Sequence, residues 1–229
     1  MTSQNDSTTR GSRVPLPVIA VAGQPGAGKT TLAHRLAREL GGAMLSMDDY
    51  QSMTAMPIPE LIRWADQGAD YDRLPVPRLA LHLAQLREGR PIRVPSTGAV
   101  VEPGRCIVLE THFGRAHRQT AALIDLLIWL DTPPDVALAR NLRNALAPAP
   151  RAGVPDDPEA RLRWAAGYLD AYLAIVARLV HLQVERIRPT ADLRIAADMP
   201  SDTVVGLVRT RLAALTRVEG NGGETGSVG

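Results

Sequence analysis

The sequence predicts an α/β fold in which a five-stranded parallel sheet is covered by helices on both faces. The first observation is that short apolar runs alternate along the chain with longer amphipathic segments. Such alternation favours parallel strands joined by helical crossovers, and continuous apolar runs are typical of strands buried on both faces. The second observation is that 45% of the 229 residues are hydrophobic, which suits one domain with a sizeable core.

The strands are predicted where continuous apolar runs of strand length occur. The first run, "PVIAVAG", ends in glycine, and the third, "RCIVLE", ends in a carboxylate. Ligands of parallel sheets bind beyond the carboxyl ends of the strands, so the residues after each run are the first candidates for a site. The predicted strands span residues 17–23, 43–47, 105–110, 124–131 and 191–198.

The helices are predicted from residue spacing and from end signals. Leu32, Leu36 and Leu40 recur every four residues before the stop "GG" at 41–42. Thr132 and Asp135 frame the start of a helix over "PPDVALARNLRNAL", as a capping pair would. Further helices are predicted over 57–68, 76–89 and 201–215. The longest predicted helix spans 159–187 and has an apolar stripe at Leu162, Ala166, Leu169, Leu173, Val176, Val180 and Val184.

The composition excludes several classes of protein. Two polar or glycine-rich tails, 1–13 and 218–229, are expected to be disordered around one domain at 14–217. The formal charge is only +2 and the arginines are spread along the chain, which argues against a nucleic-acid partner. One cysteine, no signal peptide and no apolar run of about eighteen residues indicate a cytoplasmic protein without a membrane partner. The oligomeric state stays open, a homodimer included.

A glycine-rich segment follows the first predicted strand and opens a helix. It satisfies the pattern G-x-x-x-x-G-K-[ST] in the structural context that the motif requires. The backbone N–H groups of such a loop converge on phosphate oxygens, its lysine reaches the β- and γ-phosphates, and its threonine hydroxyl coordinates Mg²⁺. The residues predicted to bind nucleotide here are Gly23, Gln24, Pro25, Gly26, Ala27, Gly28, Lys29, Thr30 and Thr31.

Lys29 is the only lysine in a chain with 26 lysines and arginines. The wide planar guanidinium of arginine would not fit inside a phosphate-binding loop, so the two cations are not exchangeable there. The single lysine also argues against a Ras-type GTPase. Such proteins read guanine through N-K-x-D or T-K-x-D, and no second lysine is present to form either motif.

Two short acidic clusters are candidates for an acceptor site. Asp48, Asp49 and Tyr50 follow the second predicted strand, and Tyr71 and Asp72 repeat the pattern. A carboxylate at a strand end can accept the proton of an attacking hydroxyl and help to hold Mg²⁺. The adjacent tyrosines suggest a pocket for a ring or a sugar. Aspartate pairs are also common in solvated turns, and that alternative stays open.

With these motifs in order, most of residues 17–215 resemble the uridine kinase and phosphoribulokinase group of P-loop small-molecule kinases. The stretch Ser46-Met47-Asp48-Asp49-Tyr50 matches the Ser-x-Asp-x-Phe/Tyr element of uridine kinases, and "YDRLPVPRLALHLAQLREG" matches the stretch that follows it. The resemblance implies a P-loop NTPase kinase fold with a helical lid at about 140–158. It also implies ATP as the donor, Mg²⁺ as the cofactor and a small-molecule hydroxyl as the acceptor.

The resemblance assigns roles to individual residues. It makes Asp48 the catalytic base, and places Arg151 and Pro189 beside the nucleotide. The implied catalytic residues are Lys29, Asp48, Arg140 and Arg143, and the implied metal ligands are Thr30, Asp48 and Glu110. The implied acceptor-binding residues are Asp48, Tyr50, Tyr71, Asp72 and Glu110.

The chain departs from uridine kinases after the helix that ends at Gly89. Ser96 and Thr97 replace the Tyr-Asp pair of that family, and the hairpin that grips the nucleoside is shortened. His112, Phe113 and Arg115, just past the third strand, are candidates to replace the lost contacts and to bind the acceptor. A nucleoside is the leading acceptor by resemblance, and a sugar, a pantothenate-like precursor, a hydroxyl-bearing antibiotic or a biosynthetic intermediate stay open. GTP as donor, an ATPase switch and a catalytically inactive nucleotide-binding fold are further alternatives.

Overall fold

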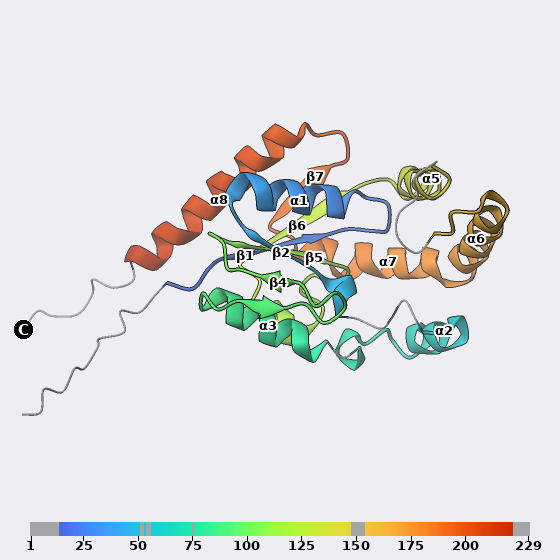
Figure 1. Cartoon of the computed structure of the whole chain (residues 1–229), viewed down its shortest axis with the longest axis horizontal. Helices are drawn as coiled ribbons and strands as arrows, with labels where there is room; N and C mark the ends of the chain where they lie inside the picture. Colours follow the sequence, from blue (N-terminus) through green and yellow to red (C-terminus); the bar gives the residue numbers. More distant parts are fainter. Residues whose placement is uncertain (1–13, 51–52, 54–55, 75, 148–153, 222–229) are drawn as a thin grey trace, which may run out of the picture.

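The central sheet has five parallel strands, as the sequence predicts, and their order is β2–β5–β1–β6–β7 (Figure 1). The structure is a computed structural model that describes residues 14–50, 53, 56–74, 76–147 and 154–221. The strands of the sheet are β1 (Val18–Ala22), β2 (Ala43–Ser46), β5 (Ile107–Thr111), β6 (Leu126–Asp131) and β7 (Leu193–Ala196).

Helices cover both faces of the sheet. Figure 1 shows α1 and α8 on one side of the strands and α3 on the other. The helices are α1 (Lys29–Leu40), α2 (Ile58–Asp66), α3 (Pro77–Arg87), α4 (Arg118–Ala121), α5 (Pro134–Ala145), α6 (Pro158–Ala171), α7 (Ala177–Arg186) and α8 (Ser201–Asn221). α8 continues past the predicted domain end at 217.

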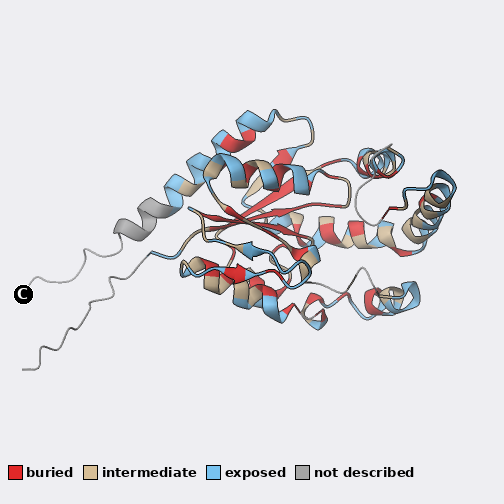
Figure 2. Ribbon diagram, in the orientation of Figure 1, coloured by how far each residue is buried: buried red, intermediate tan, exposed pale blue. Residues whose placement is uncertain are grey.

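The core forms because alternate residues of β1 point to opposite faces of the sheet. Val18 and Ala20 belong to the cluster that includes the leucines of α3, whereas Ile19 and Val21 belong to the cluster that includes α1 and α8. All four side chains are fully buried. Figure 2 shows the strands as the most continuously buried part of the molecule. The continuous apolar run therefore reflects burial on both faces, as predicted.

A two-stranded antiparallel hairpin lies beside the turn that follows β2. It consists of β3 (Ile92–Arg93) and β4 (Val100–Val101). Ser96, between the two strands, donates a hydrogen bond from its Oγ to Oδ1 of Asp49. The shortened hairpin is therefore attached to the turn that carries Asp48.

The predicted capping role of Thr132 at the start of α5 is wrong. The N-cap position is Pro133, without a side-chain capping bond, and Thr132 donates its hydroxyl hydrogen to the carbonyl oxygen of Ala27 at 3.4 Å. Thr132 therefore binds the glycine-rich loop rather than its own helix. This contact joins segments that are remote in sequence, so local spacing does not reveal it.

The apolar stripe predicted for the longest helix is wrong in its first half. Leu162, Leu169 and Leu173 are 63%, 37% and 81% exposed, respectively. The helix contains a π-helical segment, η4 (Tyr172–Val176), which changes the direction in which later side chains point. α6 also projects beyond the carboxyl edge of the sheet in Figure 1, whereas Ile175, in η4, packs into the core.

The same long helix meets the length and composition requirements of a membrane span. Within the described part of the chain, Pro158–Thr190 has a mean hydropathy of 1.3 over 18 residues, 17% of which are buried. A search for continuous apolar runs misses it because Asp170 and Arg178 interrupt the sequence. Its second half is part of the domain, since Arg178 contacts Asp66 of α2 at 2.6 Å.

Asp131, at the end of β6, offers a test of pH-dependent stability. Two hydrogen bonds from Nε and Nη2 of Arg188, at 3.0 and 2.6 Å, hold the pKa of the Asp131 carboxyl below its ordinary value. Its contribution is present above the unfolded-state pKa and is lost as the pH falls through the folded-state pKa. Both side chains are partly exposed, so we expect Asp131→Asn to cost about 0.5–1 kcal/mol at pH 7.

The measurement is the melting temperature of Asp131→Asn and wild type at pH 7 and at pH 3. The difference should shrink at pH 3, because this pH lies below the ordinary pKa of an aspartate, so the unfolded chain binds a proton at this position and the stabilising contribution of the ion pair falls. Asp170→Asn, at an exposed position on α6, is the matched control and should change little at either pH. An Asp131→Asn deficit of the same size at both pH values would contradict the prediction.

Candidate active site

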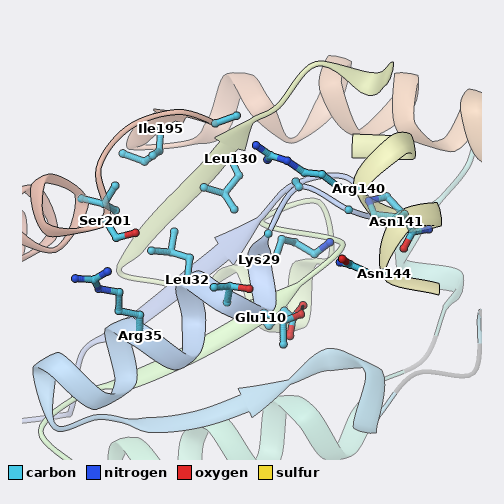
Figure 3. A pocket seen from close by; sticks show the side chains of 18 of the residues that line it. Lys29, Leu32, Arg35, Glu110, Leu130, Arg140, Asn141, Asn144, Ile195 and Ser201 are labelled. Carbon is cyan, nitrogen blue, oxygen red and sulfur yellow. Dashed lines mark hydrogen bonds between the residues drawn. The ribbon is translucent and has the colours of Figure 1, made fainter. Parts of the chain in front are cut away.

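One cavity of about 690 Å³ opens at the carboxyl edge of the sheet, where the sequence predicts a ligand site. Its walls come from the glycine-rich loop, α1, α5, the turn after β2, the ends of β5, β6 and β7, and the segment that leads from β7 into α8 (Figure 3). The predicted site residues in these walls are Pro25, Gly26, Ala27, Gly28, Lys29, Thr30, Thr31, Asp48, Glu110, His112, Arg140 and Arg143.

Gly23 and Gln24 join the first part of the loop to the end of β6 and the residue that follows it. Gln24 is 3% exposed, and its Nε2 donates to the carbonyl oxygen of Thr132. A Cβ on Gly23 would lie 3.2 Å from the Cβ of Leu130, so the loop leaves β1 in close contact with β6. These contacts fix the loop against the end of β6.

Lys29 places one buried cation at the N-terminus of α1. The residue is 5% exposed, and its Nζ donates to the carbonyl oxygen of Gln24 at 3.1 Å. No acidic residue occurs in the first turn of α1, where backbone N–H groups already favour an anion. The loop, the helix terminus and the lysine together form a site for phosphate.

A second group of oxygen atoms lies beside the loop. The Thr30 hydroxyl donates to Oε1 of Glu110 at 2.7 Å, and Ser46 Oγ lies 3.5 Å from Oε2 of the same carboxylate. Glu110 is 6% exposed and has these hydroxyls as neighbours. A hydroxyl and a carboxylate next to a phosphate site are hard oxygen donors of the kind that Mg²⁺ uses. The predicted metal ligands Thr30 and Glu110 are thus brought together.

Asp48 and His112 meet at the mouth of the cavity. Oδ1 of Asp48 lies 3.1 Å from Nε2 of His112, although 64 residues separate them in the chain. His112 is the more buried partner, with 16% of its side chain exposed against 56% for Asp48. The carboxylate therefore faces the cavity with an imidazole that can orient it.

α5 carries a polar face on the opposite wall. Arg140 and Arg143, both predicted, line the cavity, and Figure 3 shows Arg140 reaching across the loop toward Leu130. Asn141 and Asn144 line it as well, and sequence reasoning missed both. Asparagine within a helix gives no signal of its own, and the arginine spacing supplied the only clue. Arg151 lies outside the described residues.

Several residues expected on the acceptor side make other contacts. Oη of Tyr50 lies 3.0 Å from Nδ1 of His82, and burial, together with the charge of Asp49, raises the pKa of Tyr50 to about 12. Tyr71 is 6% exposed and packs edge-on against Trp64, and burial raises its pKa.

Asp72, Arg115 and Pro189 are also absent from the cavity walls that the structure describes. The backbone N–H of Arg118 donates to Asp72 at 2.8 Å, and this hydrogen bond is the main reason that the Asp72 pKa is lowered. Arg115 donates to Asp192 at 2.7 Å. The structure thus brings Asp48, Glu110 and His112 to the cavity, whereas Asp72, Arg115 and Pro189 lie elsewhere.

The end of the cavity away from the asparagines of α5 is largely apolar (Figure 3). Sequence reasoning missed these residues, since each reads as an ordinary core position. They are Leu32, Leu130, Ile195, Met199 and Val204, with Arg35 and Ser201 at the rim. An apolar slot next to a phosphate site suits a flat, partly apolar ring.

Gly26 and Gly28 form a matched pair for testing how tightly α5 packs on the loop. Both have positive φ angles, +83° and +96°, which cost an alanine about 1–2 kcal/mol. An added Cβ on Gly26 would also lie 2.0 Å from the carbonyl oxygen of Ala137, whereas one on Gly28 meets nothing within 4 Å. We expect Gly26→Ala to lower the free energy of unfolding by about 3 kcal/mol or more.

Urea unfolding of the two variants checks this prediction. Gly28→Ala carries the backbone strain without the clash and should lose clearly less. Equal losses for the two variants would mean that α5 does not pack on the loop as described.

Comparisons with known proteins give the wider context. No curated protein matches the chain. A sugar kinase from Janibacter sp. is 20% identical with a TM-score of 0.47, covering 87% of this chain and 95% of that one. Shikimate kinase from Acinetobacter baumannii, in complex with shikimate, is 18% identical with a TM-score of 0.45, covering 87% and 94%. A possible uridine kinase from Bacillus stearothermophilus is 16% identical with a TM-score of 0.47, covering 81% and 91%.

A match to a family model shows the family to which the chain belongs. A family model described as "AAA domain" matches residues 19–145, more than half of the chain. The matched segment begins in β1, includes the glycine-rich loop and Glu110, and ends at the last residue of α5. A parallel five-stranded sheet with this loop after β1 is a P-loop kinase-like fold. The chain therefore belongs to the AAA domain family of P-loop proteins.

Proposed function

We propose that this chain is a Mg²⁺-requiring kinase that transfers the γ-phosphoryl group of ATP to a hydroxyl group of a small molecule. One observation carries the proposal. A single cavity joins the P-loop with the Thr30–Glu110 pair, the Asp48 carboxylate and two arginines of α5. Phosphoryl transfer needs this combination, because its catalysis consists mostly of positioning and charge neutralisation.

The donor would bind along the P-loop with its base in the apolar slot beyond it. The loop N–H groups and Lys29 would hold the phosphates, and Leu32, Leu130 and Ile195 would contact the base. These base contacts are apolar, so they do not separate adenine from guanine. ATP is the proposed donor by the resemblance to uridine kinases, and GTP belongs in the assay as the alternative.

The residues beside the P-loop fit Mg²⁺. The described residues contain no group of three or more His, Cys, Asp or Glu side chains that could hold a metal ion by themselves. Mg²⁺ in nucleotide sites is bound by one or two carboxylates together with the phosphates, so such a group is not needed. Thr30 and Glu110 would hold the ion, with Asp48 nearby. When bound, it would neutralise charge on the phosphates.

Asp48 would act as the base on the acceptor side. The acceptor oxygen would attack the γ-phosphorus, its proton would pass to the Asp48 carboxylate, and the bond between the γ-phosphorus and the β–γ bridging oxygen would break to release ADP. His112, 3.1 Å from Asp48, would orient the carboxylate. Arg140 and Arg143 would stabilise the charge that develops on the transferred group.

A nucleoside such as uridine or cytidine is the leading acceptor, supported by the resemblance of residues 46–50 and 71–89 to uridine kinases. The contacts made by Tyr71 and Asp72 weaken the case for a uridine-kinase type of acceptor pocket. A sugar, a pantothenate-like precursor, a hydroxyl-bearing antibiotic or a biosynthetic intermediate is therefore the alternative. The protein itself would act in the cytoplasm, as its single cysteine suggests.

The experiment is a coupled ADP-release assay with Mg·ATP or Mg·GTP and a panel of acceptors. The panel contains nucleosides, sugars, shikimate, pantothenate and hydroxylated antibiotics, and mass spectrometry identifies the product. Release that depends on one alcohol supports the proposal and names the acceptor. Lys29→Ala, which removes the buried cation, should abolish turnover and excludes a contaminating kinase. Release that depends on no acceptor would contradict the proposal and favour an ATPase switch.

Asp48→Asn separates the two halves of the proposed site. Asparagine keeps the size of the side chain but cannot accept the proton, so we expect kcat to fall by about 10²-fold or more. The affinity for Mg·ATP should stay nearly unchanged, because the P-loop and Lys29 are intact. Single-turnover kinetics and a direct nucleotide titration measure the two quantities. Weaker nucleotide binding with little change in kcat would make Asp48 a metal ligand or a structural residue instead.

A further inference from the structure

Asn141 is a buried polar residue in the wall of the cavity that neither the sequence motifs nor the proposed mechanism uses. It lies on α5 between the two arginines of the polar face and is only 2% exposed. Its neighbours Arg140, Arg143 and Asn144 are all more exposed. Asn141 is therefore the most deeply placed polar side chain that α5 contributes to the cavity.

The amide nitrogen of Asn141 has an unused capacity to donate. Within the part of the chain that the structure describes, its Nδ2 has no hydrogen-bond partner. Buried amide groups of folded proteins are nearly always paired, because burial without a partner is costly. Because Asn141 is one of the residues that line the cavity, a ligand bound there can supply the missing acceptor.

The position of Asn141 relative to the P-loop is tightly set. A Cβ built on Gly26 would lie 3.2 Å from the Cβ of Asn141 and 2.0 Å from the carbonyl oxygen of Ala137, so α5 packs directly on the loop backbone. Thr132, just before α5, accepts from Gln24 and donates to Ala27. Asn141 thus lies beside the middle of the loop. Figure 3 shows it at the end of the cavity that α5 forms, away from Leu32 and Ser201.

We propose that Asn141 donates a hydrogen bond from Nδ2 to a phosphate oxygen of the nucleotide bound in the P-loop. The ligand class is the polyphosphate of a nucleoside di- or triphosphate, so this inference rests on the proposed function. Arg140 and Arg143 of α5, which are less buried, attract any anion that enters the cavity. The buried Nδ2 of Asn141 carries two N–H donors without a partner, so it favours a phosphate oxygen seated within hydrogen-bond distance of it.

The test compares Asn141→Leu with Asn144→Leu in the full chain. Leucine has nearly the shape of asparagine but no donor, and Asn144 is an exposed residue one turn further along α5. If the donor is unused in the free protein, Asn141→Leu should leave the melting temperature unchanged or raise it. Its affinity for Mg·ATP should fall roughly ten- to hundredfold, the usual effect of losing a hydrogen bond to a charged group. Asn144→Leu should lose clearly less affinity.

Tripolyphosphate serves as a second probe because it has no base or ribose. We expect Asn141→Leu to weaken tripolyphosphate binding by a factor similar to that for Mg·ATP. If Asn141→Leu does not fold, Asn141→Asp replaces the donor by a carboxylate of the same shape. Circular dichroism checks the fold of this variant, and its affinity for both probes should then fall at least as far, since a negative charge would face the phosphates.

Four outcomes would overturn the inference. A lower melting temperature for Asn141→Leu with unchanged affinity would mean that the amide has a structural partner. Equal losses for the two leucine variants would mean that its position is not special. A loss for Mg·ATP without one for tripolyphosphate would place the contact on the base or ribose. A wild-type protein that binds neither probe would overturn the inference together with the proposed function. In the first three outcomes the wild-type protein still binds the nucleotide, so the proposed function is not affected.

Discussion

The parallel pairing of β1 with β5 and β6 is the constraint on which the candidate site depends. The register places Val21 opposite Glu110 and Ala22 opposite Trp129, so all three strands end at nearly the same level. Oε1 of Glu110 consequently lies 2.7 Å from the hydroxyl oxygen of Thr30, the second residue of α1. A shift of β5 by one residue would turn Glu110 to the other face of the sheet and separate these two side chains.

A second constraint links the two walls of the cavity. Thr132 holds the P-loop through Gln24 and Ala27, and the first turns of α5 rest on Gly26. The helix that carries the arginines is therefore seated on the loop that would bind the phosphates. A ligand that displaced one of these segments would have to move the other, because packed interiors leave little room for independent shifts.

The sequence predicts most of the fold and about half of the site, and the division has a physical reason. The five strands and the P-loop follow from local patterns, and Asp48 and Glu110 follow from the rule that parallel sheets bind ligands at their carboxyl edge. The sequence could not show that Tyr71 packs on Trp64, because a Tyr-Asp pair looks the same in sequence whether the ring lines a pocket or the core. Asn141 leaves no trace in the pattern, since its role depends on how α5 packs against a loop more than 100 residues earlier.

The solitary lysine has a consequence for how the protein responds to chemical reagents. Among its side chains the chain offers one primary amine, that of Lys29, a residue that is only 5% exposed in the P-loop. Every other basic side chain is a guanidinium or an imidazole. Acylating reagents that target ε-amino groups therefore address a single point in the molecule. The rate at which Lys29 is acylated depends on how accessible the P-loop is. That rate therefore reports whether a ligand occupies the loop.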